Sequence, residues 1–280
     1  MRAHPLFDLI TQRLHGGRNL VVLTGAGISA ESGIPTFRGD DGFWTRGSRN
    51  YRPEELATWA TFVAEPEVVW PWYLWRLACC RGSQPNAGHR ALVAMDSLLQ
   101  DQFLLVTQNV DGLHSRAGSP ENRTFHIHGN LERMRCADAC STRTWAVPAA
   151  LRTFSKGDSI QPDDAPHLRC PTCGGWARPH VLWFDECYDE RWFRFDSTMR
   201  AAAAAEVLVI VGGSGSTNLP IQMATNALNT GALVVELNVA ESGFTPYAEA
   251  SDGGLVTGPS GTTLPQLLAA LRESMALHGG

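Results

Sequence analysis

Continuous apolar runs alternate with segments of helical periodicity along most of this chain. The first run, LVVL within residues 19–24, has no polar position and is typical of a strand buried on both faces of a sheet. We expect further strands at the start of 103–114, over 123–136, at the start of 206–216 and over 232–238. Helices are expected over 4–16, 53–80, 86–100, 219–229 and 263–276, the third of them capped by Asn86.

This order of strand, Gly-rich turn and helix predicts an α/β fold, a doubly wound parallel sheet of the Rossmann-like kind. Two segments break the pattern, because 53–80 is unusually rich in aromatic side chains and 136–177 is polar and weakly periodic. We therefore expect three parts. They are a Rossmann-like domain of residues 1–45, 84–133 and 178–280, a helical insertion of residues 46–83, and a small module of residues 134–177.

Composition narrows the class of protein. The chain has 280 residues, of which 44% are hydrophobic and 18% charged, as is typical of a globular protein. Its net charge of −5 gives no electrostatic reason to expect nucleic acid or a membrane surface as a partner. No apolar run reaches the roughly 18 residues that a membrane helix needs. The N-terminus lacks the pattern of an export signal, so we expect a cytoplasmic protein, in which clustered cysteines favour metal over disulfides.

Two Gly-rich turns follow predicted strands. Gly25 and Gly27 end the first strand, but the next glycine, Gly33, does not follow at the spacing of the dehydrogenase fingerprint. A second turn, GGSGS from Gly212, follows the strand that starts near 206. Such turns cradle phosphate with backbone N–H groups, although a tight turn in any α/β protein has the same composition. Two of them in one sheet favour a dinucleotide across the strand ends, with Glu236 and Asn238 near a ribose.

Four cysteines form two closely spaced pairs, Cys136 with Cys140 and Cys170 with Cys173. Two thiolate pairs in turn-rich sequence suit one tetrahedral zinc ion, and four cysteine ligands leave no open position for catalysis. The alternative is four unrelated buried thiols. We expect a structural zinc.

Polar side chains follow the strand that starts near 103. Asn109 and Asp111 lie where an α/β sheet usually holds its chemistry. His126 and His128 alternate on the strand expected over 123–136, so they should point to opposite faces. Beside a nucleotide site, one of the two is a candidate general base, because imidazole titrates near neutral pH.

Several motifs stand in one order along the chain: GAGISAESGIPTFRG, TQNVDGLHSRAGS, HIHGN, the two Cys pairs and RPHVLWFDE. In this order and rough spacing, over about residues 10–240, the chain resembles the sirtuin family of NAD-dependent protein lysine deacylases. The resemblance implies NAD as a consumed cosubstrate rather than a hydride carrier. It also implies acyl-lysine proteins or peptides as the partners.

The resemblance implies roles for individual residues. His128, in HIHGN, matches the catalytic base, whereas His126 matches a variable position and receives no role. In the family, the acyl-lysine carbonyl oxygen attacks the ribose as nicotinamide leaves, and the base then activates a ribose hydroxyl. The implied cofactor-binding residues are Gly25, Ala26, Gly27, Phe37, Arg38, Gln108, Asn109, Asp111, Gly212, Ser214 and Asn238.

The acyl-lysine peptide is implied to enter as a strand between VLWFDE and GSGSTN, which makes Val181, Trp183 and Phe184 substrate-binding. Two departures from the family pattern stand at this point. Where the family usually has Phe-Gly-Glu, this chain has Asp185 in place of the glycine. This substitution would put a carboxylate where the peptide strand should run. Where the family usually has Gly-Thr-Ser, this chain has Gly213 in place of the threonine, which removes a hydroxyl from the nucleotide site.

The helical insertion resembles the class that removes short dicarboxylic acyl groups, and Ala57, Tyr73 and Arg76 match the residues of its acyl pocket. A guanidinium and a phenol are also what a carboxylate-tipped chain needs for bidentate pairing and one further hydrogen bond. The alternative is that Tyr73 and Arg76 are an aromatic side chain and a solvated cation one helical turn apart.

The sequence therefore predicts a lysine desuccinylase or demalonylase with weaker deacetylase activity that releases nicotinamide and O-acyl-ADP-ribose. A plain deacetylase, a mono-ADP-ribosyltransferase on the same scaffold, and a non-catalytic nucleotide-sensing zinc protein stay open as alternatives. The intact His128, Asn109 and Asp111 count against the last of these. The oligomeric state stays unknown.

Overall fold

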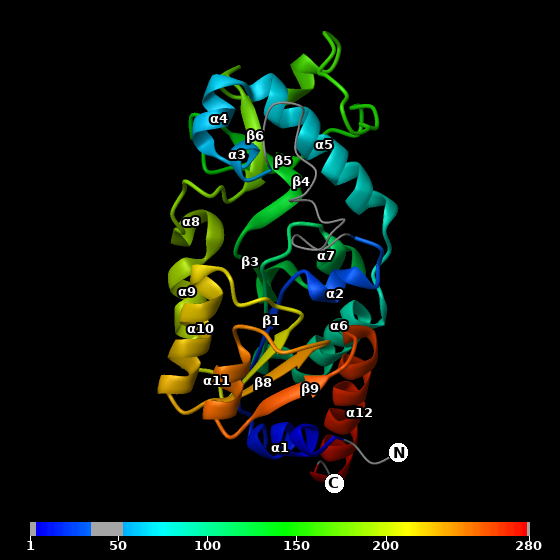
Figure 1. Cartoon of the computed structure of the whole chain (residues 1–280), viewed down its shortest axis with the longest axis vertical. Helices are drawn as coiled ribbons and strands as arrows, with labels where there is room; N and C mark the ends of the chain where they lie inside the picture. The colour runs from blue at the N-terminus through cyan, green and yellow to red at the C-terminus, as the bar shows by residue number, and fades with distance from the viewer. Residues whose placement is uncertain (1–3, 35–52, 279–280) are drawn as a thin grey trace.

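The computed structural model describes residues 4–34 and 53–278, in two parts stacked along the long axis of the molecule (Figure 1). The lower part is built on a six-stranded sheet of order β3-β2-β1-β7-β8-β9 in which every pairing is parallel. Its strands are β1 (Leu20–Thr24), β2 (Phe103–Thr107), β3 (Thr124–His126), β7 (Val207–Val211), β8 (Leu233–Asn238) and β9 (Gly254–Thr257).

Helices cover both faces of this sheet because its central strands are apolar on both sides. Val22 and Val209 pack into a cluster with α1, α6 and α12, whereas Val21 and Leu208 pack with α9, α10 and α11. The helices of the first face are α1 (Pro5–Arg13), α6 (Ala87–Leu99) and α12 (Ser260–His278), and those of the second are α9 (Phe195–Ala203), α10 (Asn218–Asn229) and α11 (Thr245–Ala250). The predicted doubly wound parallel sheet is confirmed.

The upper part holds a three-stranded antiparallel sheet of order β5-β4-β6 and the aromatic helices (Figure 1). Trp70 and Trp183 are almost fully buried in its core, and the indole of Trp70 donates a hydrogen bond to the Ala177 carbonyl at 2.9 Å. The elements are β4 (Gly129–Cys136), β5 (Thr144–Ala146), β6 (Ala177–Val181), α3 (Pro53–Leu56), α4 (Trp59–Ala64) and α5 (Pro66–Gly82).

Shorter elements connect the two parts and the sheet edges. They are α2 (Gly27–Ala30), α7 (Leu113–Ala117), α8 (Glu190–Phe193) and the 3-10 turns η2 (Gln100–Gln102), η3 (Glu121–Arg123) and η4 (Ala165–Leu168). Within the described ranges, no helix has both the length and the apolar character that crossing a membrane requires.

Two details of the sequence prediction are wrong. The strand expected over 123–136 is two strands in different sheets, with Ile127 and His128 in the turn between β3 and β4. His126 and His128 therefore do not alternate on one strand. The single helix expected over 53–80 is three helices, because Thr58 caps α4 through its hydroxyl and Pro66 starts α5.

Among the side chains that the structure describes, three histidines have less than a tenth of their surface exposed: His89, His114 and His180. Burial lowers the pKa of His89 to about 4 and that of His180 to about 3, and it lowers the pKa of His114 well below its ordinary value. An unfolded chain takes up these protons near pH 6.5, whereas the folded chain stays neutral until the pH is much lower. The stability that depends on these histidines being neutral is therefore fully present above about pH 6.5 and is lost as the pH falls toward 4.

We expect the free energy of unfolding to fall steadily between pH 7 and pH 4.5, measured by urea titration at several pH values. His89→Gln provides a matched variant, because the His89 ring accepts from the Asn86 N–H in a capping box, and Gln fills that position well. This variant should show a shallower pH dependence. The same slope in both proteins would contradict a role for His89.

Candidate active site

The strand order of the large sheet reverses between β1 and β7, and the turns at their carboxyl ends lie in contact. The Gly27 N–H donates to the Gly212 carbonyl at 2.9 Å. A Cβ on Gly27 would lie 2.6 Å from the Gly212 Cα, and Gly212 has a φ of 59°, so both positions require glycine. Ligands of open α/β sheets bind at such a switch point.

Three polar side chains are joined below the first turn. The Asn109 amide donates to the Gly25 carbonyl at 2.9 Å and to the Ser29 hydroxyl at 3.3 Å. The Ser29 hydroxyl donates to the Asp111 carboxylate at 2.7 Å, and the Leu113 N–H donates to its other oxygen at 2.8 Å. Burial raises the pKa of Asp111 against these hydrogen bonds. The network fixes Asn109 and Asp111 beside the Gly-rich turn.

Gln108 carries a buried donor that has no partner among the described residues. Its amide oxygen accepts from the Thr217 hydroxyl at 2.9 Å. Its amide nitrogen is buried and has no hydrogen-bond partner within residues 4–34 and 53–278. A buried polar atom without a partner costs free energy, and a bound polar ligand would remove that cost. With the Gly-rich turns beside it, the site fits NAD.

The turn after β7 holds the far side of the site. The Asn238 amide donates to the Gly213 carbonyl at 3.0 Å, which ties the end of β8 to this turn. A Cβ on Gly213 would lie 2.7 Å from the buried Phe244 ring, so the packing of Phe244 accounts for glycine at this departure from the family pattern. Ser214 lies in the same turn and bonds to Ser216.

Glu236 is not available to a ribose. It is fully buried, and it accepts hydrogen bonds from Ser242, Thr245 and Asn238. Its expected place near the nucleotide is wrong, because these donors use both carboxylate oxygens inside the protein. Two other predicted cofactor residues, Phe37 and Arg38, lie outside the described residues.

His128 stands between the two parts of the molecule, and its ring is fixed at both nitrogens. Nδ1 lies 3.0 Å from the Gln108 carbonyl oxygen, and Nε2 lies 2.7 Å from the Tyr188 hydroxyl. Burial lowers the pKa of His128 to about 4, against the opposing effect of the Gln108 carbonyl. The imidazole is therefore neutral at pH 7, the state in which it can accept a proton.

The structure brings most of the predicted substrate-binding residues together. Ala57, Tyr73, Val181 and Trp183 share one buried cluster in the upper part. The Trp183 indole N–H donates to the Tyr73 hydroxyl at 2.7 Å, and burial raises the pKa of Tyr73 to about 12. Tyr73 therefore keeps its proton and can donate it in a hydrogen bond. Phe184 follows with an exposed ring.

Arg76 is buried on α5, with 3% of its surface exposed, so the alternative of a solvated cation is wrong. Its guanidinium lies over the Trp72 ring at 4.5 Å from the centroid and over the Tyr73 ring at 5.5 Å. Burial lowers the pKa of Arg76 from its ordinary value. A guanidinium packed on two neighbouring aromatic rings keeps its planar fork of donors in a fixed direction.

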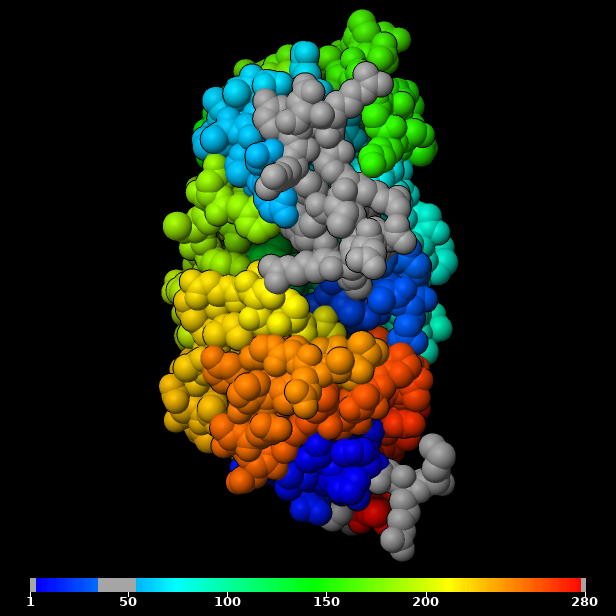
Figure 2. All heavy atoms as spheres, in the orientation of Figure 1, coloured from blue at the N-terminus to red at the C-terminus, as the bar shows by residue number. Residues whose placement is uncertain are grey.

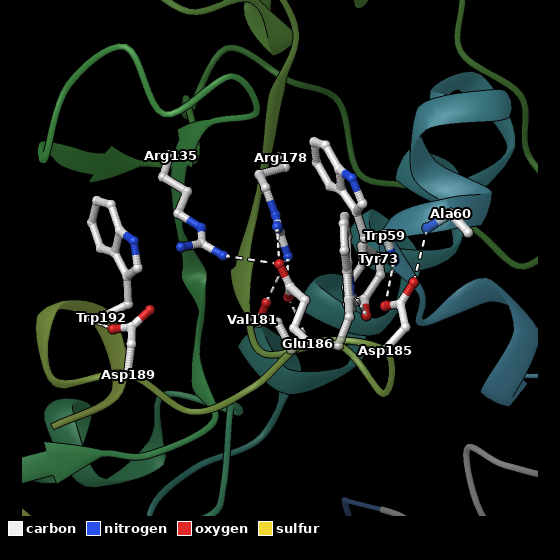
Figure 3. A network of polar contacts seen from close by, with 11 residues as sticks. Trp59, Ala60, Tyr73, Arg135, Arg178, Val181, Asp185, Glu186, Asp189 and Trp192 are labelled. Carbon is white, nitrogen blue, oxygen red and sulfur yellow. Dashed lines mark hydrogen bonds and ion pairs between the residues drawn. The ribbon is translucent and has the colours of Figure 1, made fainter. Parts of the chain in front are cut away.

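Asp185 points toward the start of α4. Its carboxylate oxygens accept from the Trp59 N–H at 2.7 Å and the Ala60 N–H at 3.0 Å, at the start of α4 (Figure 3). Free N–H groups of a first helical turn and the helix dipole favour a carboxylate there. Asp185 therefore has partners within the protein, which account for a carboxylate at this departure from the family pattern.

Further contacts fix the same loop to the upper part. The Phe184 N–H donates to the Ala57 carbonyl at 3.0 Å. Glu186 pairs with Arg178 at 2.7 Å and lies 3.6 Å from Arg135, between strands β4 and β6 (Figure 3). In the space-filling view, α3 and α4 in light blue meet the yellow-green surface that contains α8 (Figure 2).

Two residues of the site escaped the sequence analysis. Ser29 joins Asn109 to Asp111, and its only signal is its place in the motif that follows Gly27. Tyr188 contacts His128 from a position 60 residues away, so no local pattern could reveal it.

The four predicted zinc ligands come together at the outer end of the small sheet. Their sulfur atoms all lie within 4.8 Å of one another, and the two closest pairs, Cys136–Cys173 and Cys140–Cys170, are 3.6 Å apart. Zn–S bonds near 2.3 Å put tetrahedral sulfurs about 3.8 Å apart, whereas a disulfide needs about 2.05 Å. The cluster fits one structural zinc ion.

Comparisons with known proteins agree with this site. The model of the Sir2 family matches residues 25–218. A protein of Leptospira interrogans named NAD-dependent protein deacylase is 37% identical over 95% of this chain and 98% of its own length. NAD-dependent protein deacylase 1 of Pseudomonas aeruginosa is 40% identical over 92% and 96%. A solved complex of a Sir2 homologue with NAD has a TM-score of 0.77 and 34% identity, covering 96% of this chain and 94% of its own.

We expect the purified protein to carry about one zinc per chain, measured by elemental analysis of reduced protein. Cys136→Ser should lower the melting temperature strongly, because a structural zinc contributes its binding free energy to folding. Cys187→Ser is the matched control, since Cys187 is an exposed cysteine outside the cluster. Wild-type stability of the Cys136 variant, with no zinc in either protein, would contradict the assignment.

Proposed function

The chain belongs to the Sir2 family of NAD-dependent protein deacylases, and we propose that it removes succinyl or malonyl groups from lysine side chains, with weaker deacetylase activity. The observation that supports this specificity is a buried cation and a protonated phenol held side by side. Arg76 and Tyr73 are both almost fully buried on α5, and the Tyr73 hydroxyl is fixed by Trp183.

The chemistry of these two side chains matches a short dicarboxylic acyl chain. A guanidinium pairs bidentately with a carboxylate, and such charge-assisted bonds contribute about 1.5–3 kcal/mol. The Tyr73 hydroxyl already accepts from the Trp183 indole, so its own hydrogen is free to donate to a second acceptor. Ala57, a small side chain in the same cluster, leaves room for the longer acyl chain.

We assign the nucleotide to the switch point of the large sheet. Gly25, Gly27 and Gly212 would bring the backbone close to the phosphates, with Ala26 in the first turn. Gln108, Asn109 and Asp111 would hold the nicotinamide end, and Ser214 and Asn238 the adenosine end. Bound NAD would supply two reactive groups of its ribose. One is the carbon that bonds to the acyl-lysine oxygen, and the other is the hydroxyl from which a base removes a proton.

We assign His128 as that base. It is neutral, its Nδ1 is oriented by the Gln108 carbonyl, and its Nε2 can accept a proton. The peptide would lie along the loop that follows β6, near Val181, Trp183 and Phe184. Because Asp185 binds to α4 and not to the peptide path, it gives no support to the alternative of an ADP-ribosyltransferase that has lost deacylation.

We expect His128→Ala to lower deacylation by about 10²–10⁴-fold, the usual contribution of a general base. NAD should still bind, because the proposed base acts after nicotinamide has left. The measurements are the rate of peptide deacylation and NAD binding by calorimetry. His126→Ala is the neighbouring control and should stay within a few-fold of wild type. Near wild-type turnover in the His128 variant would assign the base elsewhere.

We expect wild type to favour succinyl-lysine over acetyl-lysine by about 10²–10³ in catalytic efficiency, since two charge-assisted hydrogen bonds act together. Arg76→Met should remove most of this preference and leave deacetylation within a few-fold. The measurement is kcat/KM on succinyl and acetyl peptides of one sequence.

Arg81→Met is the matched control for that experiment, because Arg81 lies on the same helix and pairs with Glu132 at the surface. It should keep the preference. A wild type that favours acetyl-lysine, or an equal loss of both activities in the Arg76 variant, would support a plain deacetylase instead.

A further inference from the structure

Tyr188 lies on the loop between β6 and α8, and its hydroxyl is 2.7 Å from His128 Nε2. The two rings lie 5.8 Å apart at an angle of 35°. This nitrogen is the one that the proposed reaction needs, because the other ring nitrogen is already engaged.

The Gln108 carbonyl determines the tautomer of His128. A carbonyl oxygen only accepts, so His128 Nδ1, 3.0 Å away, carries the proton. The neutral ring then has one lone pair in its plane, on Nε2. The Tyr188 hydroxyl donates to that lone pair, so the proton-accepting atom of the base is occupied.

The position of Tyr188 is fixed by contacts on both sides of it. Before it, Glu186 pairs with Arg178 and accepts from the Trp183 N–H at 3.0 Å (Figure 3). After it, Asp189 caps α8 by accepting from the Trp192 N–H at 2.6 Å. The Tyr188 ring also packs against the apolar cluster of the large sheet, 6.4 Å from the Phe195 ring. The loop therefore presents this hydroxyl to His128 in one place.

The single lone pair of His128 Nε2 cannot accept well-aligned hydrogen bonds from two hydroxyl groups at the same time. For His128 to take a proton from a ribose hydroxyl, that hydroxyl must donate to Nε2 in place of Tyr188. We propose that Tyr188 is a positioning residue that occupies Nε2 of His128 in the protein without ligand and is displaced from it by the ribose hydroxyl of NAD. This inference rests on the proposed role of His128 as the base.

The proton balance involves His128 alone. The ribose O–H bond would break, its proton would bond to Nε2 and its electron pair would stay on the ribose oxygen. The Nδ1 proton stays on Nδ1, hydrogen-bonded to the Gln108 carbonyl, so the ring becomes an imidazolium. Tyr188 keeps its own proton throughout, and burial raises the pKa of its phenol well above the ordinary value. Its hydroxyl orients the base and takes no part in the transfer.

The hydrogen bond is tested first by nitrogen NMR of histidine-labelled protein, which requires no activity. The His128 signals are identified by their absence in His128→Ala. In the free protein, Tyr188→Phe should move the Nε2 resonance of His128. Tyr247→Phe should not, and it is the matched control because Tyr247 packs against the same cluster from α11. Equal Nε2 resonances in wild type and Tyr188→Phe would overturn the proposal.

The displacement is tested by adding ADP-ribose to the same samples. If the ribose hydroxyl replaces Tyr188, the Nε2 resonances of wild type and Tyr188→Phe should converge on one value. Resonances that still differ at saturation would show that Tyr188 stays on the base, and this would overturn the proposal.

The effect of Tyr188 on the reaction is measured as the ratio of two rates, deacylation and nicotinamide exchange, at a fixed nicotinamide concentration. Tyr188→Phe should raise this ratio by about two- to tenfold, the effect of removing one competing hydrogen bond. Damage to the fold would lower both rates and leave the ratio unchanged. A lower ratio, with exchange intact, would make Tyr188 a participant in the proton transfer and overturn the proposal.

The absence of deacylation in wild type would contradict the proposed function. The NMR experiment would still test the hydrogen bond between Tyr188 and His128.

Discussion

The backbone contact between the turns after β1 and β7 is the constraint on which the rest of the site depends. Gly27 and Gly212 approach so closely that neither position has room for a side chain. The polar side chains of the site are bonded to the same two turns. The Asn109 amide bonds to the Gly25 carbonyl, and the Asn238 amide bonds to the Gly213 carbonyl. Main-chain packing thus holds together the two halves of the proposed nucleotide site, and it fixes the carbonyl groups to which Asn109 and Asn238 bond.

One short segment connects the two parts of the molecule at the chemistry. Within the loop after β6, Asp185 binds α4, Glu186 binds β6 through Arg178, and Tyr188 binds His128. Ala57 and Tyr73, which we assign to acyl recognition, contact Phe184 and Trp183 of the same segment. His128, which we assign to proton transfer, contacts Tyr188 a few residues further on. An irregular segment can hold such precision because several of its polar groups are bonded to regular elements, as Asp185 is to α4 and Glu186 to β6.

The sequence was sufficient for the features that local pattern determines. The strands β1, β7 and β8 are apolar at almost every position, and the two Cys pairs have metal-ligand spacing, so the sheet and the zinc site were predictable. Contacts between distant segments were not. The turn at His128 has the alternating pattern of a strand, and only the pairing of β3 with β2 and of β4 with β6 breaks it. The direction of Asp185 depends on N–H groups 126 residues away.

The capping of α4 also has a consequence for motion. A helix start is normally completed by the residue just before it, as Thr58 does for the Thr61 N–H. Here the Trp59 and Ala60 N–H groups depend on Asp185, which belongs to the loop after β6. Fraying of this helix and loosening of the loop therefore break the same hydrogen bonds and belong to one cooperative opening. The segments that we propose for acyl and peptide binding would then open and close together.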